Sequence, residues 1–247
     1  MSAKFTTVKN DLSNEIQPLD NQVVRTDDPL PLRPISYLIV GRKGSGKSTM
    51  MLNLLKRKSS PYYRAFDNVF LISPTARRDE KFDKLVDELD RDGKFYEELS
   101  EEVIDEILQR VNTFNREYKY EHPKSEPRNL LIIDDCIHMM PTSTTKSSIN
   151  AIYTNQRHSK LSVFTCSQQL NKINRLIRTN ADMLTFFPTD NKKEFECIQD
   201  EWSIKPELLK DVYDYATDRD NSFLHIVFGR RPIFFKRFDR IVVGNGE

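Results

Sequence analysis

The chain has 247 residues, and its 38 Lys and Arg nearly balance its 37 Asp and Glu, for a formal net charge of +1. This length suits one α/β domain with a full core, and the near-neutral balance means that any nucleic-acid contact must come from local patches. The three cysteines form no C-x-x-C pair and share no ligand spacing with the four histidines, which argues against a structural zinc site. Free thiols favour a reducing compartment. No window approaches the ~18 apolar residues of a membrane span.

The first segment, residues 1–34, is polar and contains Pro18, Pro29, Pro31 and Pro34. We expect an extended or flexible N-terminal arm there, followed by one folded domain over residues 35–247. The arm is either an interaction segment or a disordered leader, and the sequence favours neither.

Residues 35–50 read ISYLIVGRKGSGKSTM, which predicts a buried strand, a glycine-rich turn and the start of a helix over about 47–58. The pattern G-x-x-x-x-G-K-S is that of a phosphate-binding P-loop, whose backbone N–H groups surround the phosphates. Lys47 would bring positive charge to the β- and γ-phosphates of ATP, and the Ser48 hydroxyl would bind Mg²⁺. The predicted nucleotide-binding residues are Gly41, Arg42, Lys43, Gly44, Ser45, Gly46, Lys47, Ser48 and Thr49.

Strands and helices are predicted to alternate along the rest of the chain. Apolar runs predict strands over 67–73, 129–136, 161–166 and 181–187, and a terminal strand pair over 222–228 and 232–238. Helical spacing predicts helices over 79–91, 144–156, 173–178, 192–202 and 206–216, with a loop over 118–129. Six acids between residues 97 and 106 favour the solvated face of an amphipathic helix capped by Ser100 over a metal site. The pattern predicts an α/β fold: a mainly parallel sheet with helices on both faces and a C-terminal antiparallel strand pair.

The strand NLLIIDDC ends in two carboxylates, as a Walker B strand does. Asp134 would hold Mg²⁺ opposite Ser48, and Asp135 suits the base that activates the attacking water. The alternative is a pair of capping aspartates at a strand end.

Gln168 follows the strand 161–166 and is a candidate for contacting the γ-phosphate or the attacking water, since an amide both donates and accepts hydrogen bonds. Gln169 is an equally polar neighbour, and a solvent-facing glutamine is the alternative. Arg157, Arg175 and Arg178 are candidates for an arginine finger, because we expect each near a strand end on the nucleotide side. The basic and aromatic stretch 229–240 either contacts a DNA backbone or forms an edge hairpin guarded by cations, and we favour the hairpin.

Taken together, GRKGSGKS, LLIIDDC, NQRH, TCSQQ and RLIRTNADMLTFF resemble motifs of the FtsK–HerA superfamily. The set is most similar to the genome-packaging ATPases of double-jelly-roll DNA viruses and virophages. The family motifs fall on Asp134-Asp135, Arg157-His158, Gln168 and residues 178–182, and the resemblance covers roughly residues 33–240.

This resemblance implies a RecA-like P-loop NTPase that forms a homo-oligomeric ring. It also implies that ATP hydrolysis drives double-stranded DNA into a preformed capsid, in the virion or in the host cytoplasm. Another ring-forming DNA translocase or helicase would share the motifs. A nucleotide-dependent switch is less favoured, because no N-K-x-D guanine-reading motif is present and Asp135 supplies a base. The catalytic set is therefore expected to be Lys47, Asp135 and Gln168, with Arg157 or Arg178 acting on the adjacent subunit.

Overall fold

A computed structural model describes residues 5–8, 28–140, 147–229 and 231–243 of the chain. Its strands are β1 (Phe5–Val8), β2 (Ser36–Val40), β3 (Asn68–Ile72), β4 (Phe95–Tyr96), β5 (Asn129–Asp134), β6 (Leu161–Ser167), β7 (Met183–Phe186), β8 (Leu224–Val227), β9 (Ile233–Lys236) and β10 (Asp239–Val243). Its α-helices are α1 (Lys47–Lys56), α2 (Asp83–Arg91), α3 (Glu101–Glu121), α4 (Ser148–Thr154), α5 (Arg175–Thr179), α6 (Lys192–Trp202) and α7 (Pro206–Ala216). Two short 3₁₀ turns cover Ala76–Arg78 and Ile137–Met139.

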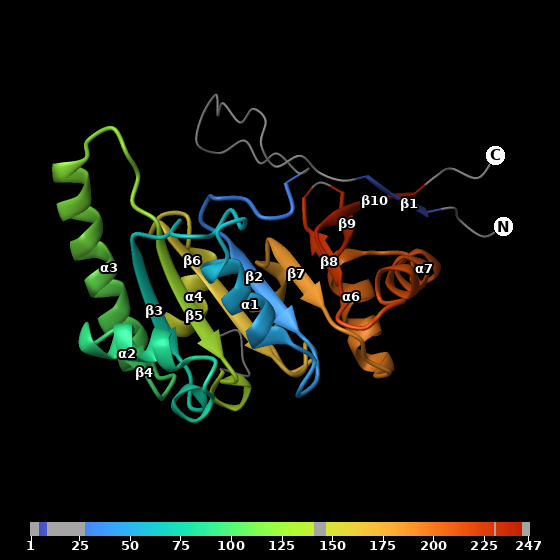
Figure 1. Ribbon diagram of the computed structural model, residues 1–247, viewed down its shortest axis with the longest axis horizontal. Coiled ribbons are helices and arrows are strands. Elements are labelled where there is room, and N and C mark those ends of the chain that lie inside the picture. Colours follow the sequence, from blue (N-terminus) through green and yellow to red (C-terminus); the bar gives the residue numbers. More distant parts are fainter. Residues whose placement is uncertain (1–4, 9–27, 141–146, 230, 244–247) are drawn as a thin grey trace.

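These strands form one ten-stranded sheet in the order β1-β10-β9-β8-β7-β2-β6-β5-β3-β4 (Figure 1). The strands from β7 to β4 run parallel to one another. The central strands β2, β5 and β6 are buried along their whole length, as expected for parallel strands that helices cover on both faces. Strands β8, β9, β10 and β1 add in antiparallel fashion beyond β7. The predicted fold class is confirmed, and the predicted strand pair is part of a larger antiparallel section.

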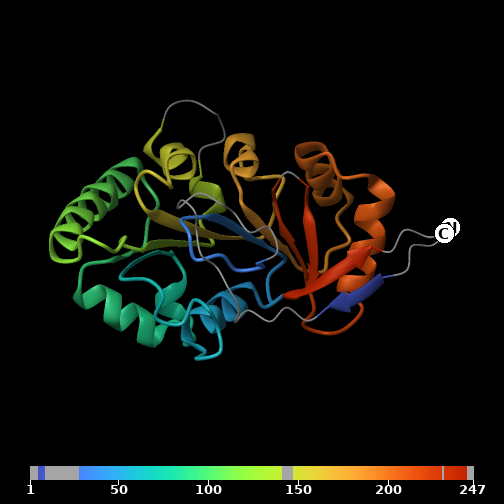
Figure 2. The same ribbon diagram turned by 90° about the horizontal axis from the view of Figure 1, so that it is seen from above.

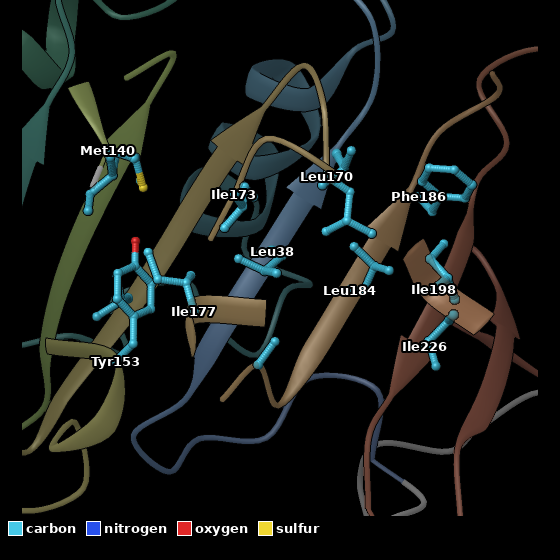
Figure 3. Packing of buried hydrophobic residues seen from close by; sticks show 14 of the residues in the cluster. Leu38, Met140, Tyr153, Leu170, Ile173, Ile177, Leu184, Phe186, Ile198 and Ile226 are labelled. Atoms are coloured by element: carbon cyan, nitrogen blue, oxygen red, sulfur yellow. The ribbon is translucent and has the colours of Figure 1, made fainter. Parts of the chain in front are cut away.

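Helices cover the two faces of the sheet unequally (Figure 2). Helices α1 and α2 pack on one face, and α3 to α7 pack on the other. Figure 3 shows side chains of α4, α5 and α6 meeting Leu38, Leu184 and Ile226 of the sheet. The buried side chains on this face form one continuous cluster. Burial of each side chain of this size contributes about 1.5–3 kcal/mol to the stability of the fold. Within the described residues, no helix has the length and apolar character needed to cross a bilayer.

The predicted elements recur within a few residues of their expected bounds, with two differences. Helix α3 continues to Glu121, so the first part of the predicted loop 118–129 is helical. Strands β1, β4 and β10 had no prediction. The expected Ser100 cap is present, since the Val103 N–H donates to Ser100 Oγ at 3.3 Å. Residues 144–146 of the predicted helix 144–156 lie outside the described residues.

Two parts of the predicted N-terminal arm are described, residues 5–8 and 28–34, and both contact the sheet domain. Strand β1 pairs with β10, and Leu30 is buried at 2% exposure. Further along, the Tyr62 hydroxyl donates to the Pro31 carbonyl at 3.1 Å, and Arg33 pairs with Asp182 at 2.8 Å. The expected boundary at residue 34 therefore does not separate residues 28–34 from the domain. Residues 1–4 and 9–27 of the expected arm lie outside the described residues.

The basic stretch 229–240 has the hairpin form that the sequence favours, although β9 is not an edge strand. Strand β9 lies between β8 and β10, and its Phe234 and Phe235 are buried. Lys236 is bound to Asp218 at 2.6 Å. Phe234, Phe235 and Lys236 therefore make contacts within the domain, as expected for the hairpin alternative.

Candidate nucleotide-binding site

The glycine-rich turn between β2 and α1 has the geometry of a P-loop. Gly44 and Gly46 adopt positive φ angles of 79° and 98°, which side chains with a Cβ rarely tolerate. Gly41 is required for a different reason, because a Cβ there would lie 2.6 Å from both Phe187 Cβ and Ser45 Oγ. The turn therefore depends on glycine both for its dihedral angles and for its close approach to Phe187, the residue after β7.

The helix that follows this turn presents its amino end to the carboxyl edge of the sheet. Gly46 offers no side-chain cap, and the first turn of α1 holds no acid. Uncapped N–H groups and the positive end of the helix dipole favour an anion at this place. Lys47 Nζ donates to the Arg42 carbonyl at 3.0 Å. Burial lowers the pKa of Lys47, while nearby Cys166, Asp134 and Asp135 oppose that shift.

Ser48 and Asp134 meet beside this helix end. Ser48 Oγ donates to Asp134 Oδ1 at 3.2 Å, although the two residues belong to α1 and β5. Asp134 is 4% exposed. Burial raises the pKa of this carboxyl, and hydrogen bonds from Cys166 and Ser48 oppose the rise. A hydroxyl and a carboxylate converging at one point are the hard oxygen ligands that Mg²⁺ prefers.

Asp135 and Gln168 lie at the ends of the neighbouring strands β5 and β6. Gln168 Nε2 donates to Asp135 Oδ1 at 2.9 Å. Asp135 adopts a positive φ of 57°, a backbone conformation that is uncommon for a residue other than glycine. The backbone N–H of Gln169 bonds instead to Ser167 Oγ at 3.2 Å. Of the two glutamines, Gln168 is the one that reaches the second carboxylate.

The three candidate arginines each pair with a carboxylate outside the P-loop. Arg157 lies in the turn before β6, at the amino ends of the parallel strands, because α4 returns the chain to that edge. There it pairs with Asp182 at 3.5 Å and is 62% exposed. Arg178 is 13% exposed and pairs with Glu201 at 2.5 Å, and Arg175 pairs with the same carboxylate at 3.2 Å. The expectation that these arginines lie on the nucleotide side of their own subunit is wrong for Arg157.

The structure adds three contributors that sequence reasoning missed. Phe187 lies under the P-loop glycines, and Cys166 lies beside Asp134. Glu194, the buried carboxylate of α6, accepts from the Leu170 and Asn171 N–H groups at 2.6 and 3.3 Å and so holds the loop that follows Gln168. No local pattern marks these residues, since their partners lie far away in the sequence.

The sequence also matches a known protein family over most of its length. The family model described as "Poxvirus A32 protein" matches residues 26–227. The chain belongs to the poxvirus A32 protein family. The match spans the P-loop, both carboxylates, Gln168 and the candidate arginines. No curated protein sequence matches the chain.

Solved structures share the fold of this A32-family chain. The genome packaging NTPase B204 from Sulfolobus turreted icosahedral virus 2, in complex with ATP-gammaS, aligns with a TM-score of 0.60 at 17% identity, over 85% of this chain and 100% of that chain. The same protein in complex with sulfate gives 0.59 at 19% identity, over 82% and 96%. B204, the DNA-packaging ATPase from Sulfolobus turreted icosahedral virus, aligns with a TM-score of 0.52 at 18% identity, over 83% of this chain and 94% of that chain. The expected resemblance to viral genome-packaging ATPases is confirmed.

Proposed function

We propose that this A32-family chain is an ATP-hydrolysing motor that moves double-stranded DNA and packages a viral genome into a preformed capsid. The observation that carries the proposal is the convergence of Lys47, Ser48, Asp134, Asp135 and Gln168 at one edge of the sheet, from α1, β5 and β6. The named relatives support it, since the B204 proteins are genome-packaging enzymes and one was solved with an ATP analogue.

Each residue has a role that follows from its chemistry. Lys47 and the α1 N–H groups bind and neutralise the β- and γ-phosphates. Ser48 and Asp134 would hold Mg²⁺, which supplies further positive charge to the phosphate oxygens. Asp135 accepts a proton from the attacking water, while the Gln168 amide orients that water. Gln168 already contacts Asp135, so one hydrogen bond holds both residues beside the place where the water must lie.

Arg157 is the better candidate for a finger that acts on the nucleotide of the adjacent subunit. Strand β6 has seven residues, which at about 3.3 Å per residue place Arg157 roughly 20 Å from the Gln168 end of the strand. Arg157 therefore cannot serve its own site. A head-to-tail contact between subunits, which closes into a ring, brings the amino edge of one sheet to the carboxyl edge of the next. Arg178 is less suited, because its guanidinium is buried against Glu201.

A local excess of positive charge supports DNA as the partner. Residues 29–66 contain no Asp or Glu but hold Arg33, Arg42, Lys43, Lys47, Lys56, Arg57, Lys58 and Arg64. Lys56, Arg57, Lys58 and Arg64 are exposed around the turn after α1. Such a cluster attracts phosphate groups even though the net charge of the chain is near zero.

The test is nucleotide turnover by the full chain with ATP or GTP, in the presence and absence of duplex DNA. We expect ATP hydrolysis that duplex DNA stimulates, and loss of that activity in Lys47→Ala. The matched control is Lys124→Ala, which removes an exposed lysine in the turn after α3 and outside the basic cluster. Undiminished turnover in Lys47→Ala would refute the site, GTP preference would favour a nucleotide-dependent switch, and stimulation by single-stranded DNA alone would favour a helicase.

A further inference from the structure

A groove of about 550 Å³ lies beside the P-loop, on the side away from Asp135 and Gln168. One wall is the outer part of the P-loop, residues 42–45, and the other is the loop 217–222 between α7 and β8. Phe187 and Pro188, which follow β7, also line it. Its volume falls in the range of small-molecule sites.

The position of the groove matches the direction that a bound nucleotide must take. Asp135 and Gln168 follow β5 and β6, which lie on one side of β2 in the sheet. The groove lies on the other side of β2, beside β7 and β8. A nucleotide that directs its γ-phosphate toward Asp135 and Gln168 extends its nucleoside in the opposite direction, into this groove.

The walls of the groove are held in place by hydrogen bonds within the domain. The Tyr213 hydroxyl of α7 accepts from the Thr189 N–H at 2.6 Å and donates to the Thr189 carbonyl at 3.1 Å, which ties α7 to the segment after β7. Thr217 Oγ1 donates to the Tyr213 carbonyl at 2.8 Å. Lys236 of β9 binds Asp218 at 2.6 Å. Contacts within the domain therefore fix the relative positions of the two walls.

The loop 217–222 has two carboxylates, and they differ in whether they can accept hydrogen bonds from a ligand. Asp218 is bound to Lys236, which lowers the pKa of that carboxyl. Asp220 is exposed and, among the residues that the structure describes, has no hydrogen bond or ion pair. A carboxylate oxygen is a strong acceptor for the paired hydroxyl groups of a ribose.

We propose that this groove is the nucleoside-binding site of the chain, and that Asp220 accepts hydrogen bonds from the ribose hydroxyl groups. The inference rests on the proposed function, since it assumes that the P-loop binds a nucleoside triphosphate. It adds Asp220, outside the P-loop motifs, as a residue that determines specificity for the ribose of the nucleotide.

The test compares three ligands by calorimetry on the full chain: ATP, 2′,3′-dideoxy-ATP and inorganic tripolyphosphate, each with Mg²⁺. The wild-type chain should bind ATP about tenfold or more tightly than dideoxy-ATP, because hydrogen bonds to a charged group are lost. Asp220→Ala should bind these two ligands equally and should bind tripolyphosphate as the wild type does. Asp211→Ala, which removes an exposed acid of α7 outside the groove, should keep the wild-type preference.

The outcomes separate this inference from the proposed function. Full discrimination between ATP and dideoxy-ATP in Asp220→Ala, or none in the wild type, overturns the assignment of Asp220. Tripolyphosphate binding reports on the P-loop alone, and it also shows that a variant is folded. Binding of tripolyphosphate by Lys47→Ala at the wild-type affinity would overturn the proposed P-loop site, and the nucleoside site with it.

Discussion

The two edges of the parallel sheet use their polar groups in opposite ways. At the carboxyl edge, Lys47 donates to a carbonyl of its own loop and the helix end has no side-chain cap. At the amino edge, the buried carboxylate of Asp182 accepts from Arg33 at 2.8 Å, the Ser36 N–H at 2.9 Å, Gln156 at 2.7 Å and Arg157 at 3.5 Å.

This difference shows which edge is built to receive a ligand. Uncapped N–H donors, beside a lysine that forms no ion pair within the described residues, are arranged to bind an anion from outside. A carboxylate that accepts from four donors has no capacity left and instead joins the start of β2, the start of β7 and the turn before β6. Arg157, at 62% exposure, is the member of that network that can also face another subunit.

The largest expected effect comes from removing Arg157. Arg157→Ala should lower ATP turnover by about 10³–10⁵-fold, because an arginine finger contributes that much to phosphoryl transfer. Turnover at saturating ATP and a fixed protein concentration measures this effect. Arg178→Ala is the comparison, and we expect it to lower stability more than it lowers turnover, since Arg178 pairs with the buried Glu201.

Mixing two inactive variants tests whether Arg157 acts between subunits. In mixtures of Lys47→Ala and Arg157→Ala, some interfaces combine an intact P-loop with an intact Arg157, so part of the activity should return. Specific activity of the wild-type chain should also rise with protein concentration. Turnover independent of concentration, together with no recovery in mixtures, would assign Arg157 to the fold or to DNA.

Removing the proposed base should have the next largest effect. Asp135→Asn should bind ATP normally and hydrolyse it about 10²–10⁴-fold more slowly, because an amide does not accept the proton. Single-turnover hydrolysis, together with the Kd for ATP, separates binding from chemistry. A hydrolysis rate equal to that of the wild type would show that Asp135 is not the base and would leave it as a strand-end residue.

At the amino edge, Asp182→Ala should lower the free energy of unfolding by about 3–5 kcal/mol, because it leaves buried donors and Arg33 without their acceptor. Urea denaturation measures the loss. The matched control is Asp92→Ala: the Asp92 carboxylate pairs with Lys94 at 3.6 Å and is 59% exposed, so its removal should cost less than about 1 kcal/mol. Equal losses in the two variants would contradict the contrast between the edges.

His225 provides a smaller, pH-dependent effect in the antiparallel section. Its Nε2–H donates to the Pro29 carbonyl at 2.8 Å, and its Nδ1 accepts from Thr185 at 2.9 Å. Burial lowers the pKa of His225 from 6.5 to about 4, although the hydrogen bond to Pro29 opposes the shift. The unfolded chain therefore takes up the proton first, and this contribution to stability is complete above pH 6.5 and is lost as the pH falls toward 4.

The full contribution is about 3 kcal/mol, from 1.36 kcal/mol for each pH unit of the shift. His225→Gln should be less stable than the wild type at pH 7, and the gap should narrow by about that amount as the pH falls to 4. His138→Gln, at an exposed position, is the control. A gap that stays constant across this pH range would show that His225 is not held neutral in the fold.

Residues close together in the sequence could be assigned correctly without the structure. The P-loop, the two carboxylates at the end of β5 and the glutamine after β6 each come directly after a run of apolar strand residues, and parallel strands bring their carboxyl ends to one edge. The edge of the sheet at which Arg157 lies was not predictable in the same way, because it depends on how the short helix α4 brings the chain back to the amino edge. The extent of the arm was also not predictable: its proline-rich composition resembles a linker, yet residues 28–34 contact Asp182, just before β7, and His225 of β8.

The sequence was enough to predict strands β2, β3 and β5 to β9, the helices, the P-loop and the residues expected at the carboxyl edge of the sheet. Apolar periodicity and glycine placement act within a few residues, so they can be read locally. Three other features depend on contacts between distant segments: Phe187 beneath the P-loop, the groove at Asp220, and the ion pair between Arg33 and Asp182, which are 149 residues apart. These features arise from packing between distant segments, and such packing follows from the path of the whole chain.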